Sequence, residues 1–400
     1  MRLLVLWMVL SWFSDCAYSI SFDDFRKLLK TKTCLGCDLT NFDFSHSAGI
    51  DLAYSDLRNA DFTGSHLSGI SFENAHLRGA KFDYAVIRDV NFKRSDLREA
   101  SFEAAKISYV DFRFSHLNGS GFSDAQIIGG DFRRVNGDES FFEGAEIKES
   151  SLRNSQFMAA SFEGAVLQDV DMSNNDCRWG IFDGANLDKV SLKLGSYANS
   201  SWEGVTLLDV EAQGTTFDSS DWRLSQIDSS DFSGANFEQS DLRHVIIRQS
   251  DFKALKLTQG RAEGAIIIGS SFDFLRAFDT DWSNAQLISS DFSYSQFRGS
   301  VMNGLMATKS HFTHSNMAYT RGQYVQVREV GFKRANISYA IFTDAKFDGV
   351  DFTGIDLRYS NLDRALFDRS VFCRVTIPLL PDLPECFVWQ TLRDRLLKFK

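Results

Sequence analysis

Large apolar residues recur at every fifth position over most of this chain. Between Phe42 and Ile377, 60 of the 68 positions in this register are Phe, Leu, Ile, Val, Met, Trp or Tyr, and 27 of the 37 phenylalanines lie on it. The residue two positions earlier is nearly always Ala, Ser, Gly, Thr or Val. A helical stripe repeats every 3.6 residues and a strand every two. The period of five instead predicts a chain that bends after each unit, with one large and one small side chain facing a narrow interior.

A second period of twenty residues sets the cross-section. Phenylalanines recur at intervals of twenty from Phe42 to Phe182 and again from Phe232 to Phe372. Four units then complete one coil, with like side chains stacked in ladders, so the chain should form about seventeen coils in a rod about 80 Å long. We expect this frame to run without insertion from residue 42 to residue 377. The stretch Asn136–Asp138, which has the composition of a turn, is its weakest point.

Individual units match a known consensus. Ala60–Gly64 has the sequence ADFTG, and Ala235–Gln239 has ANFEQ. They resemble the pentapeptide-repeat family, whose pattern is A-(D/N)-(L/F)-x-x, and Thr33–Leu39 looks like the opening segment of many exported members. The resemblance covers about 340 of the 400 residues. It implies an all-β solenoid of the right-handed quadrilateral β-helix type, a handedness that the spacing alone does not give.

The first nineteen residues have the pattern of a secretory signal peptide. Arg2 supplies the positive charge, Leu3–Phe13 is apolar, and Ala17–Ser19 offers a small-x-small cleavage site. The apolar run is shorter than the about 20 residues that cross a bilayer, so we expect no stable membrane span. An uncleaved anchor and lipidation at Cys16 are the alternatives. The prediction is export to a periplasm, a lumen or the extracellular space.

The repeat needs a cap at each end, because a solenoid otherwise exposes unpaired strand edges. We divide the chain into a signal peptide (1–19), a helical cap with the opening of the repeat (20–37), the solenoid (38–377), and a proline-rich connector with an amphipathic helix (378–400). The first cap is predicted as a helix from about residue 21 to residue 30. The second, over residues 385–399, is expected to cover the last coil or, alternatively, to form a homodimer through the C-terminal end.

Export would leave five cysteines, an odd number, so at least one thiol stays free or pairs between chains. Cys34 and Cys37 have the spacing of a redox motif, but no βαβ pattern surrounds them. We expect them to form a structural disulfide or to occupy ordinary repeat positions, since Cys37 lies in the five-residue register. Thiol chemistry and metal binding are the alternatives.

The composition favours a binding protein over an enzyme or a nucleic-acid binder. A net charge of −10 argues against nucleic-acid binding, which needs a basic patch. The family resemblance suggests DNA mimicry of the kind that inhibits gyrase, but about 80 Å of B-DNA carries about 47 charges, far more than this chain. No phosphate-binding loop or Ser/His/Asp arrangement is present, and a packed interior leaves no pocket. We therefore predict a non-enzymatic exported scaffold with a protein partner, and no catalytic residues, cofactor or metal.

Two sets of apolar residues occupy positions that should face solvent. We call the large apolar residue of each five-residue unit its centre. Tyr319, Tyr339 and Tyr359 are spaced by twenty, two residues after the centres of their units, and should form one exposed ladder. A second set flanks the centres of a single face over four coils: Ile246, Ile266, Ile268, Ile288 and Met306. Contiguous exposed apolar residues often mark interaction sites, so these are the candidate partner-binding residues.

Overall fold

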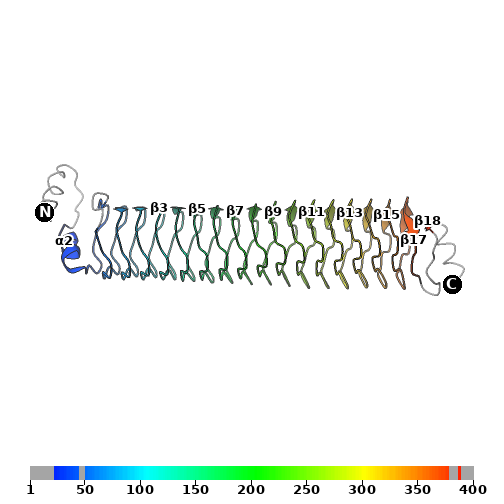
Figure 1. The fold of residues 1–400 in the computed structure, drawn as a ribbon, viewed down its shortest axis with the longest axis horizontal. Coiled ribbons are helices and arrows are strands. Elements are labelled where there is room, and N and C mark those ends of the chain that lie inside the picture. Colours follow the sequence, from blue (N-terminus) through cyan, green and yellow to red (C-terminus); the bar gives the residue numbers. More distant parts are fainter. Residues whose placement is uncertain (1–21, 45–49, 378–385, 389–400) are drawn as a thin grey trace.

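The structure, a computed structural model, describes residues 22–44, 50–377 and 386–388. These residues form a long rod of stacked coils, with helix α2 at the N-terminal end and strands β17 and β18 at the C-terminal end (Figure 1). The prediction of an all-β solenoid is confirmed. The signal peptide predicted at 1–19 lies outside the described residues, and export stays a prediction.

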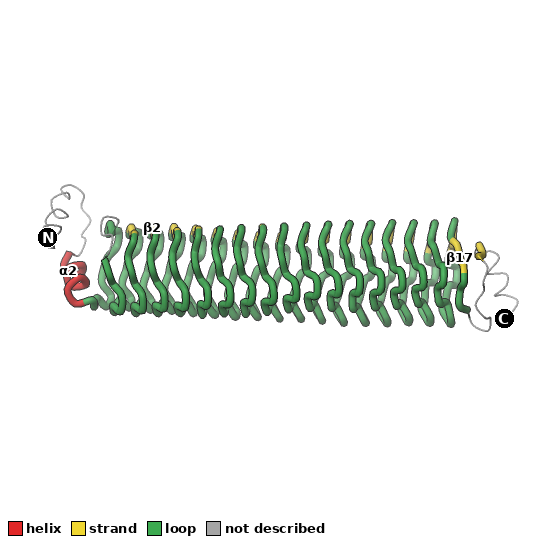
Figure 2. The backbone as a smooth tube through the Cα atoms, in the orientation of Figure 1, coloured by secondary structure: helices red, strands yellow, loops and turns green. Residues whose placement is uncertain are grey.

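One side of the rod is a sixteen-stranded parallel sheet, to which each coil contributes one three-residue strand in sequence order. On the other sides the coils meet through single β-bridges, so most of the backbone is drawn as loop (Figure 2). The sixteen strands agree with the prediction of about seventeen coils. The sheet strands are β1 His66–Ser68, β2 Val86–Arg88, β3 Lys106–Ser108, β4 Gln126–Ile128, β5 Glu146–Lys148, β6 Val166–Gln168, β7 Asn186–Asp188, β8 Thr206–Leu208, β9 Gln226–Asp228, β10 Ile246–Arg248, β11 Ile266–Ile268, β12 Gln286–Ile288, β13 Met306–Thr308, β14 Gln326–Arg328, β15 Lys346–Asp348 and β16 Leu366–Asp368.

Backbone hydrogen bonds between coils explain the five-residue unit. The Phe122 N–H donates to the Phe141 carbonyl of the next coil at 2.6 Å, and the Gly121 N–H donates to the Ala100 carbonyl of the preceding coil at 2.9 Å. The Ala125 N–H closes the turn on the Phe122 carbonyl at 3.0 Å. Two residues after each centre the backbone adopts positive φ, which bends the chain at every corner. Proline has neither the N–H nor that φ, which explains its absence from the coils.

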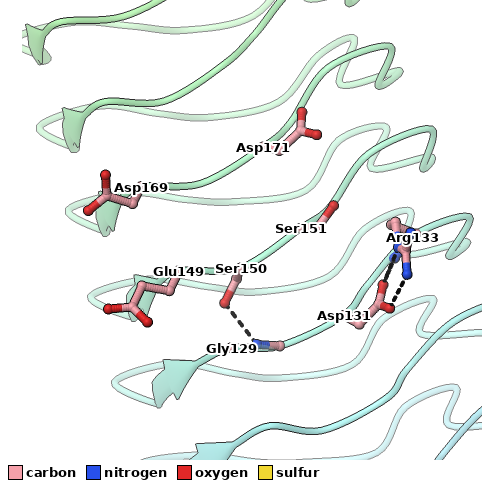
Figure 3. Close-up of a pocket in the computed structure, with 9 residues that line it drawn as sticks. Gly129, Asp131, Arg133, Glu149, Ser150, Ser151, Asp169 and Asp171 are labelled. Carbon is pink, nitrogen blue, oxygen red and sulfur yellow. Dashed lines mark hydrogen bonds and ion pairs between the residues drawn. The ribbon is translucent and has the colours of Figure 1, made fainter.

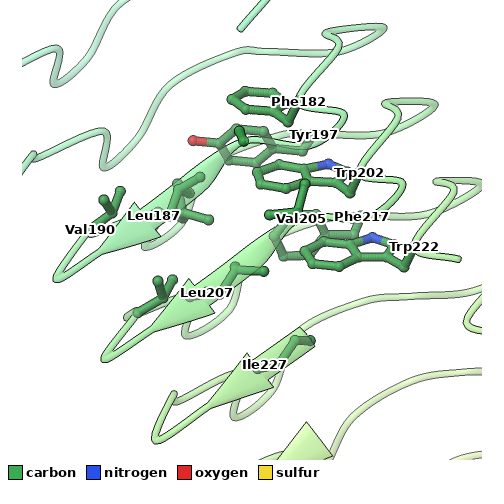
Figure 4. Close-up of a cluster of buried hydrophobic side chains, with 14 of the residues drawn as sticks. Phe182, Leu187, Val190, Tyr197, Trp202, Val205, Leu207, Phe217, Trp222 and Ile227 are labelled. Carbon is green, nitrogen blue, oxygen red and sulfur yellow. The ribbon is translucent and has the colours of Figure 1, made fainter. Parts of the chain in front are cut away.

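Stacked rings fill the interior. Phe62 and Phe82 lie 4.9 Å apart with their planes 2° from parallel, and the same column continues to Trp202 and Trp222 (Figure 4). Beyond Trp222 the stacked rings continue on the opposite face from Phe232, a face that already carries a shorter column from Phe72 to Phe132. Rings of the two faces meet edge to face, as at Trp222 and Phe232 with planes 86° apart. Both arrangements are preferred by aromatic pairs.

The first coil corrects the predicted frame. Its bridges join residues 23 apart, such as Thr33 with Asp56, whereas later bridges join residues 20 apart, such as Asp51 with Ser71. Three extra residues therefore fall between Phe44 and Ile50. Cys34, Leu39 and Phe44 are the centres of this coil, and Cys37 and Phe42 occupy the small-residue position.

Helix α2, Phe22–Thr31, makes this shift possible. It has acidic residues in its first turn, as predicted. The Phe25 ring lies 4.4 Å from the Phe42 ring, and Leu28 is fully buried. Because α2 covers the open end of the coil, a large side chain fits at a position that elsewhere holds Ala or Ser.

The C-terminal end holds the second correction. Residues 386–388, which we expected to begin a helix, form strand β18 (Cys386–Val388), which pairs antiparallel with β17 (Val371–Cys373). Phe387 is opposite Phe372, so a phenylalanine is placed beside the last rung of the aromatic column. The rest of the predicted helix and the connector lie outside the described residues.

The suspected break at Asn136–Asp138 is absent: His116, Asn136 and Gln156 pair at the regular interval of twenty. Gly137 leaves a gap in the column of centres, and the Phe157 ring of the next coil fills it. A Cβ on Gly137 would lie 2.5 Å from that ring. Large and small residues are thus exchanged between neighbouring coils.

This exchange of large and small residues predicts that a second substitution can restore the stability lost through a first one. Gly137→Leu should destabilise the rod by about 1–3 kcal/mol through overpacking. Gly137→Leu combined with Phe157→Leu should recover most of that loss, because it continues the leucine column formed by Leu57, Leu77, Leu97 and Leu117. Urea denaturation measures both variants. Gly121→Leu is the control, since a Cβ there meets nothing within 4 Å. A double variant no more stable than the single one would contradict the exchange.

Candidate functional site

The aspartate that precedes the centre of many units accepts hydrogen bonds that stabilise the coil, in addition to contributing charge to the surface. The Asp61 carboxylate accepts a hydrogen bond from the Thr63 N–H at 3.0 Å, which satisfies a donor that the neighbouring coil does not reach. Where arginine follows two residues after the aspartate, a two-pronged ion pair forms. Arg98 donates to both carboxylate oxygens of Asp96 at 2.7 Å. The hydrogen bonds from Arg98 lower the pKa of Asp96 below its ordinary value of 3.8. Much of the acidic charge is therefore paired locally.

The predicted tyrosine ladder is present as a stack. The Tyr319 and Tyr339 rings lie 4.9 Å apart, and the Tyr339 and Tyr359 rings lie 4.8 Å apart. The side chains are 49%, 46% and 63% exposed. The Arg298 guanidinium lies 5.3 Å from the centre of the Tyr319 ring and covers that end of the stack. At Tyr319 and Tyr339 the exposed parts are therefore ring edges and hydroxyl groups.

A second aromatic stack, which the sequence analysis missed, borders the same face of the rod. Phe274, Tyr294 and His314 stack with ring centres 5.1 and 4.8 Å apart. They occupy the corner before this face, and the tyrosines occupy the corner after it. The rule that identified the tyrosines, a spacing of twenty at the position two after the centre, also identifies this stack. It was missed because its three residues differ in type.

Between the two corners lies a row of side-chain amides, Gln296, Asn316 and Asn336, which we call the amide strip. The Asn316 side-chain amide donates to the Gln296 side-chain oxygen at 3.2 Å, and Asn336 donates to the Asn316 side-chain oxygen at 3.3 Å. The neighbouring outward residues Ala318 and Ser338 are small. Arg298 is the corresponding neighbour of Gln296, so the uncharged part of this stretch comprises the coils of Asn316 and Asn336. Aromatic rings border it at the corners.

The aliphatic candidates lie together on a different face. Ile246 is beside Ile266, and Ile268 is beside Ile288, in strands β10 to β12. Met306 follows in β13 and is 40% exposed, whereas the four isoleucines are half-buried. This aliphatic patch belongs to the sixteen-stranded sheet, which is opposite the face of the amide strip. The two predicted sets are therefore not parts of one surface.

A hollow of about 470 Å³ lies on the acidic middle of the rod (Figure 3). Its lining includes Glu149, Asp169 and the Asp131–Arg133 ion pair. The Ser150 hydroxyl donates to the Lys148 carbonyl at 2.6 Å and accepts from the Gly130 N–H at 3.0 Å. The Ser150 hydroxyl therefore donates to a backbone carbonyl and not to any of the carboxylates that line the hollow. The arrangement supports no assigned chemistry.

The cysteines are placed mainly at the ends of the rod. Cys34 and Cys37 form a disulfide under α2, and Cys373 and Cys386 form a second one between β17 and β18. Cys177 is free and fully buried, and its burial raises the pKa of the thiol. The Asp24 carboxylate lies within 4.8 Å of the sulfurs of Cys34 and Cys37, but these two sulfurs are already bonded to each other in the disulfide. Within the described ranges, no helix has the length and apolarity to cross a membrane.

Two protein-family models match the chain and identify its family. One model, the pentapeptide repeat region, matches residues 66–142. A second, pentapeptide repeats (8 copies), matches residues 150–188, 207–244, 223–259, 279–304 and 328–354. Together the two models cover more than half of the chain. The chain belongs to the pentapeptide-repeat family.

Two solved structures are similar to parts of the chain at low identity. HetL, a pentapeptide repeat protein involved in heterocyst differentiation regulation from the cyanobacterium Nostoc sp. strain PCC 7120, is 16% identical, covers 57% of this chain and 98% of its own, and has a TM-score of 0.35. QnrB1, a plasmid-mediated fluoroquinolone resistance protein, is 18% identical over 49% of this chain and 88% of its own, with a TM-score of 0.28. No curated protein sequence matches the chain significantly.

The lowered pKa of Asp96 predicts a pH-dependent contribution to stability. A carboxylate whose pKa is lower in the folded state stabilises the fold above its unfolded pKa, and this contribution is lost as the pH falls through the folded pKa. Asp96→Asn should therefore lower the urea midpoint at pH 7 and have almost no effect well below pH 3.8.

Asp138 is the matched control of opposite sign, because burial raises its pKa. Asp138→Asn should raise the urea midpoint at pH 7, and this gain should also disappear in acid. Equal effects of Asp96→Asn at both pH values would contradict the role of the ion pair.

Proposed function

We propose that this protein is a non-enzymatic scaffold that binds a protein partner through the amide strip and the two aromatic stacks beside it. The observation that carries the proposal is that six rings, five of them exposed, lie at the two corners of one face, on either side of the amide strip. Elsewhere charged side chains are spread over most of the acidic surface. Aromatic residues are enriched at the centres of protein interfaces, whereas charged residues are depleted there.

The geometry of the strip suggests the form of the partner. Amide groups repeat at the spacing of the coils, so a partner segment that lies along the rod meets the same donors and acceptors at regular intervals. The exposed ring edges carry partial positive charge and can contact carbonyl oxygens or the faces of other rings. An extended, weakly charged segment of a protein fits this pattern better than a strongly charged ligand.

We also propose that the protein acts outside the cytoplasm. Two disulfides support an oxidising compartment, because such bonds are rare in reducing ones. The signal-like N-terminus points the same way. DNA mimicry gains no support from the charge pattern, since ion pairs such as Asp96–Arg98 replace the unbroken rows of negative charge that B-DNA presents.

The proposal predicts selective loss of partner capture. Immobilised mature protein would be exposed to an extract of the compartment, and captured proteins would be identified by mass spectrometry. Tyr339→Ser with Tyr294→Ser should remove the partner without lowering the melting temperature, because both rings are about half exposed.

Tyr84→Ser is the matched control. Tyr84 is a 63% exposed tyrosine with the same positive φ, but it lies in the N-terminal half. It should leave capture unchanged. Ile266→Ser with Ile288→Ser tests the aliphatic patch separately. If the partner is kept by the Tyr339/Tyr294 variant, the amide strip is not the binding surface.

A further inference from the structure

The face that follows the sixteen-stranded sheet in each coil is divided, with its two corners, into a basic segment and an acidic segment. The basic segment consists of residues 88–94, 108–114, 128–134 and 148–154. The acidic segment follows it over residues 168–174, 188–194, 208–214 and 228–234. The first contains eight basic and four acidic residues, and the second contains two basic and seven acidic residues. Figure 3 shows their boundary, with Arg133 in the basic segment and Asp169 and Asp171 in the acidic one.

Both segments hold charges that the rod itself does not neutralise. In the described part of the chain, Lys93, Arg134 and Arg153 form no ion pair, although Arg113 and Arg133 bind carboxylates of their own coils. Asp169 and Asp209 in the acidic segment are exposed and likewise form no ion pair with a described residue. A partner can therefore bind these charges without first breaking an ion pair.

Large apolar side chains are exposed within the same two segments. The basic segment exposes Tyr109 (58%), Phe114 (37%) and Ile128 (41%), and the acidic segment exposes Leu194 (68%) and Leu208 (42%). Protein interfaces combine apolar contacts at their centre with polar and charged residues around them. The face therefore has the composition of a protein contact and not only that of a solvated charged surface.

The two segments are complementary to each other in a second copy of the chain. When two rods lie face to face and antiparallel, with the two-fold axis crossing them between residues 154 and 168, each basic segment faces the acidic segment of the other copy. The axis repeats every contact, so both pairs of segments meet at once. Lys148 then lies opposite Asp169 of the second copy, and Tyr109 lies in the coil opposite Leu208 of the second copy.

We propose that two copies of this chain associate side by side and antiparallel through this charge-divided face. A polyanion longer than four coils would meet the acidic segment and be repelled, whereas a second copy matches both segments. The amide strips lie on the next face, towards the C-terminal ends of the two copies, which extend beyond the paired region in opposite directions. The contact is therefore separate from the surface proposed for the protein partner.

The first experiment measures the mass and length of the mature protein. Analytical ultracentrifugation should give a dimer at about 50 mM NaCl and a monomer at about 500 mM NaCl, because salt screens exposed charges. Small-angle X-ray scattering of the dimer should give a maximum dimension of about 100 Å, compared with about 80 Å for one rod and about 160 Å for two rods joined end to end. A monomer at low salt, or a dimer of the end-to-end length, overturns the proposal.

A charge exchange between two variants locates the contact. Arg88→Glu with Lys148→Glu alters the basic segment, and Asp169→Lys with Asp228→Lys alters the residues that face it across the two-fold axis. Each variant alone should dimerise at least tenfold more weakly than the wild type, because like charges then meet. An equimolar mixture should recover the dimer, since each reversed charge meets a reversed charge and the unaltered segments still match. A mixture that stays monomeric overturns this pairing of segments.

Lys309→Glu with Lys346→Glu is the matched control. It changes the net charge by the same amount at two exposed positions that lie outside both segments. This variant should dimerise like the wild type, and loss of its dimer would assign the effect to net charge and overturn the proposed contact. Melting temperatures equal to that of the wild type confirm that the variants fold, and if one misfolds, the salt dependence and length of the wild-type dimer still decide the question.

Discussion

Hydrogen bonding between consecutive coils is the constraint on which the structure depends. In each unit the centre donates to the next coil and the residue before it donates to the preceding coil, as Phe122 and Gly121 do. No coil satisfies its own backbone, so stability comes from neighbours and the two ends are the weak points. The ends are also where the disulfides, the helix and the antiparallel strand occur. The middle needs none of these because it has a neighbour on each side.

The narrow interior is the second constraint. It restricts the volume of the inward side chains but not the residue type at outward positions. Each level of the core holds a fixed volume, so a small residue in one coil is matched by a large one nearby, as with Gly137 and Phe157. Outward residues are restricted by turn geometry and not by packing. A row of tyrosines, amides or isoleucines can therefore replace the usual charged residues without disturbing the fold. This separation explains how one scaffold can present different binding faces.

The periods of five and twenty were sufficient to predict the coil and its stacking, because inward side chains must align when coils pair in register. They could not place the first coil. There Cys37 and Leu39, and likewise Phe42 and Phe44, offer two apolar residues two positions apart, and only the pairing of Thr33 with Asp56 shows which one is the centre. Strand β18 was missed because the amphipathic spacing of residues 385–399 favours a helix, while pairing with β17 and a bond to Cys373 are non-local. The amide strip has the same spacing of twenty as the tyrosines, and it was missed because only apolar residues were considered at the outward positions.

Residue-resolved amide hydrogen exchange tests the central claim most directly, because it measures the hydrogen bonds between coils one by one. The N–H groups of centres in both halves of the rod, such as Phe122 and Phe292, should be strongly and similarly protected, since each donates to the next coil. The N–H of Ser123 should exchange quickly, because Gly121 has no side chain to accept it. Protection confined to one half of the rod, or equal at Phe122 and Ser123, would contradict a continuous ladder.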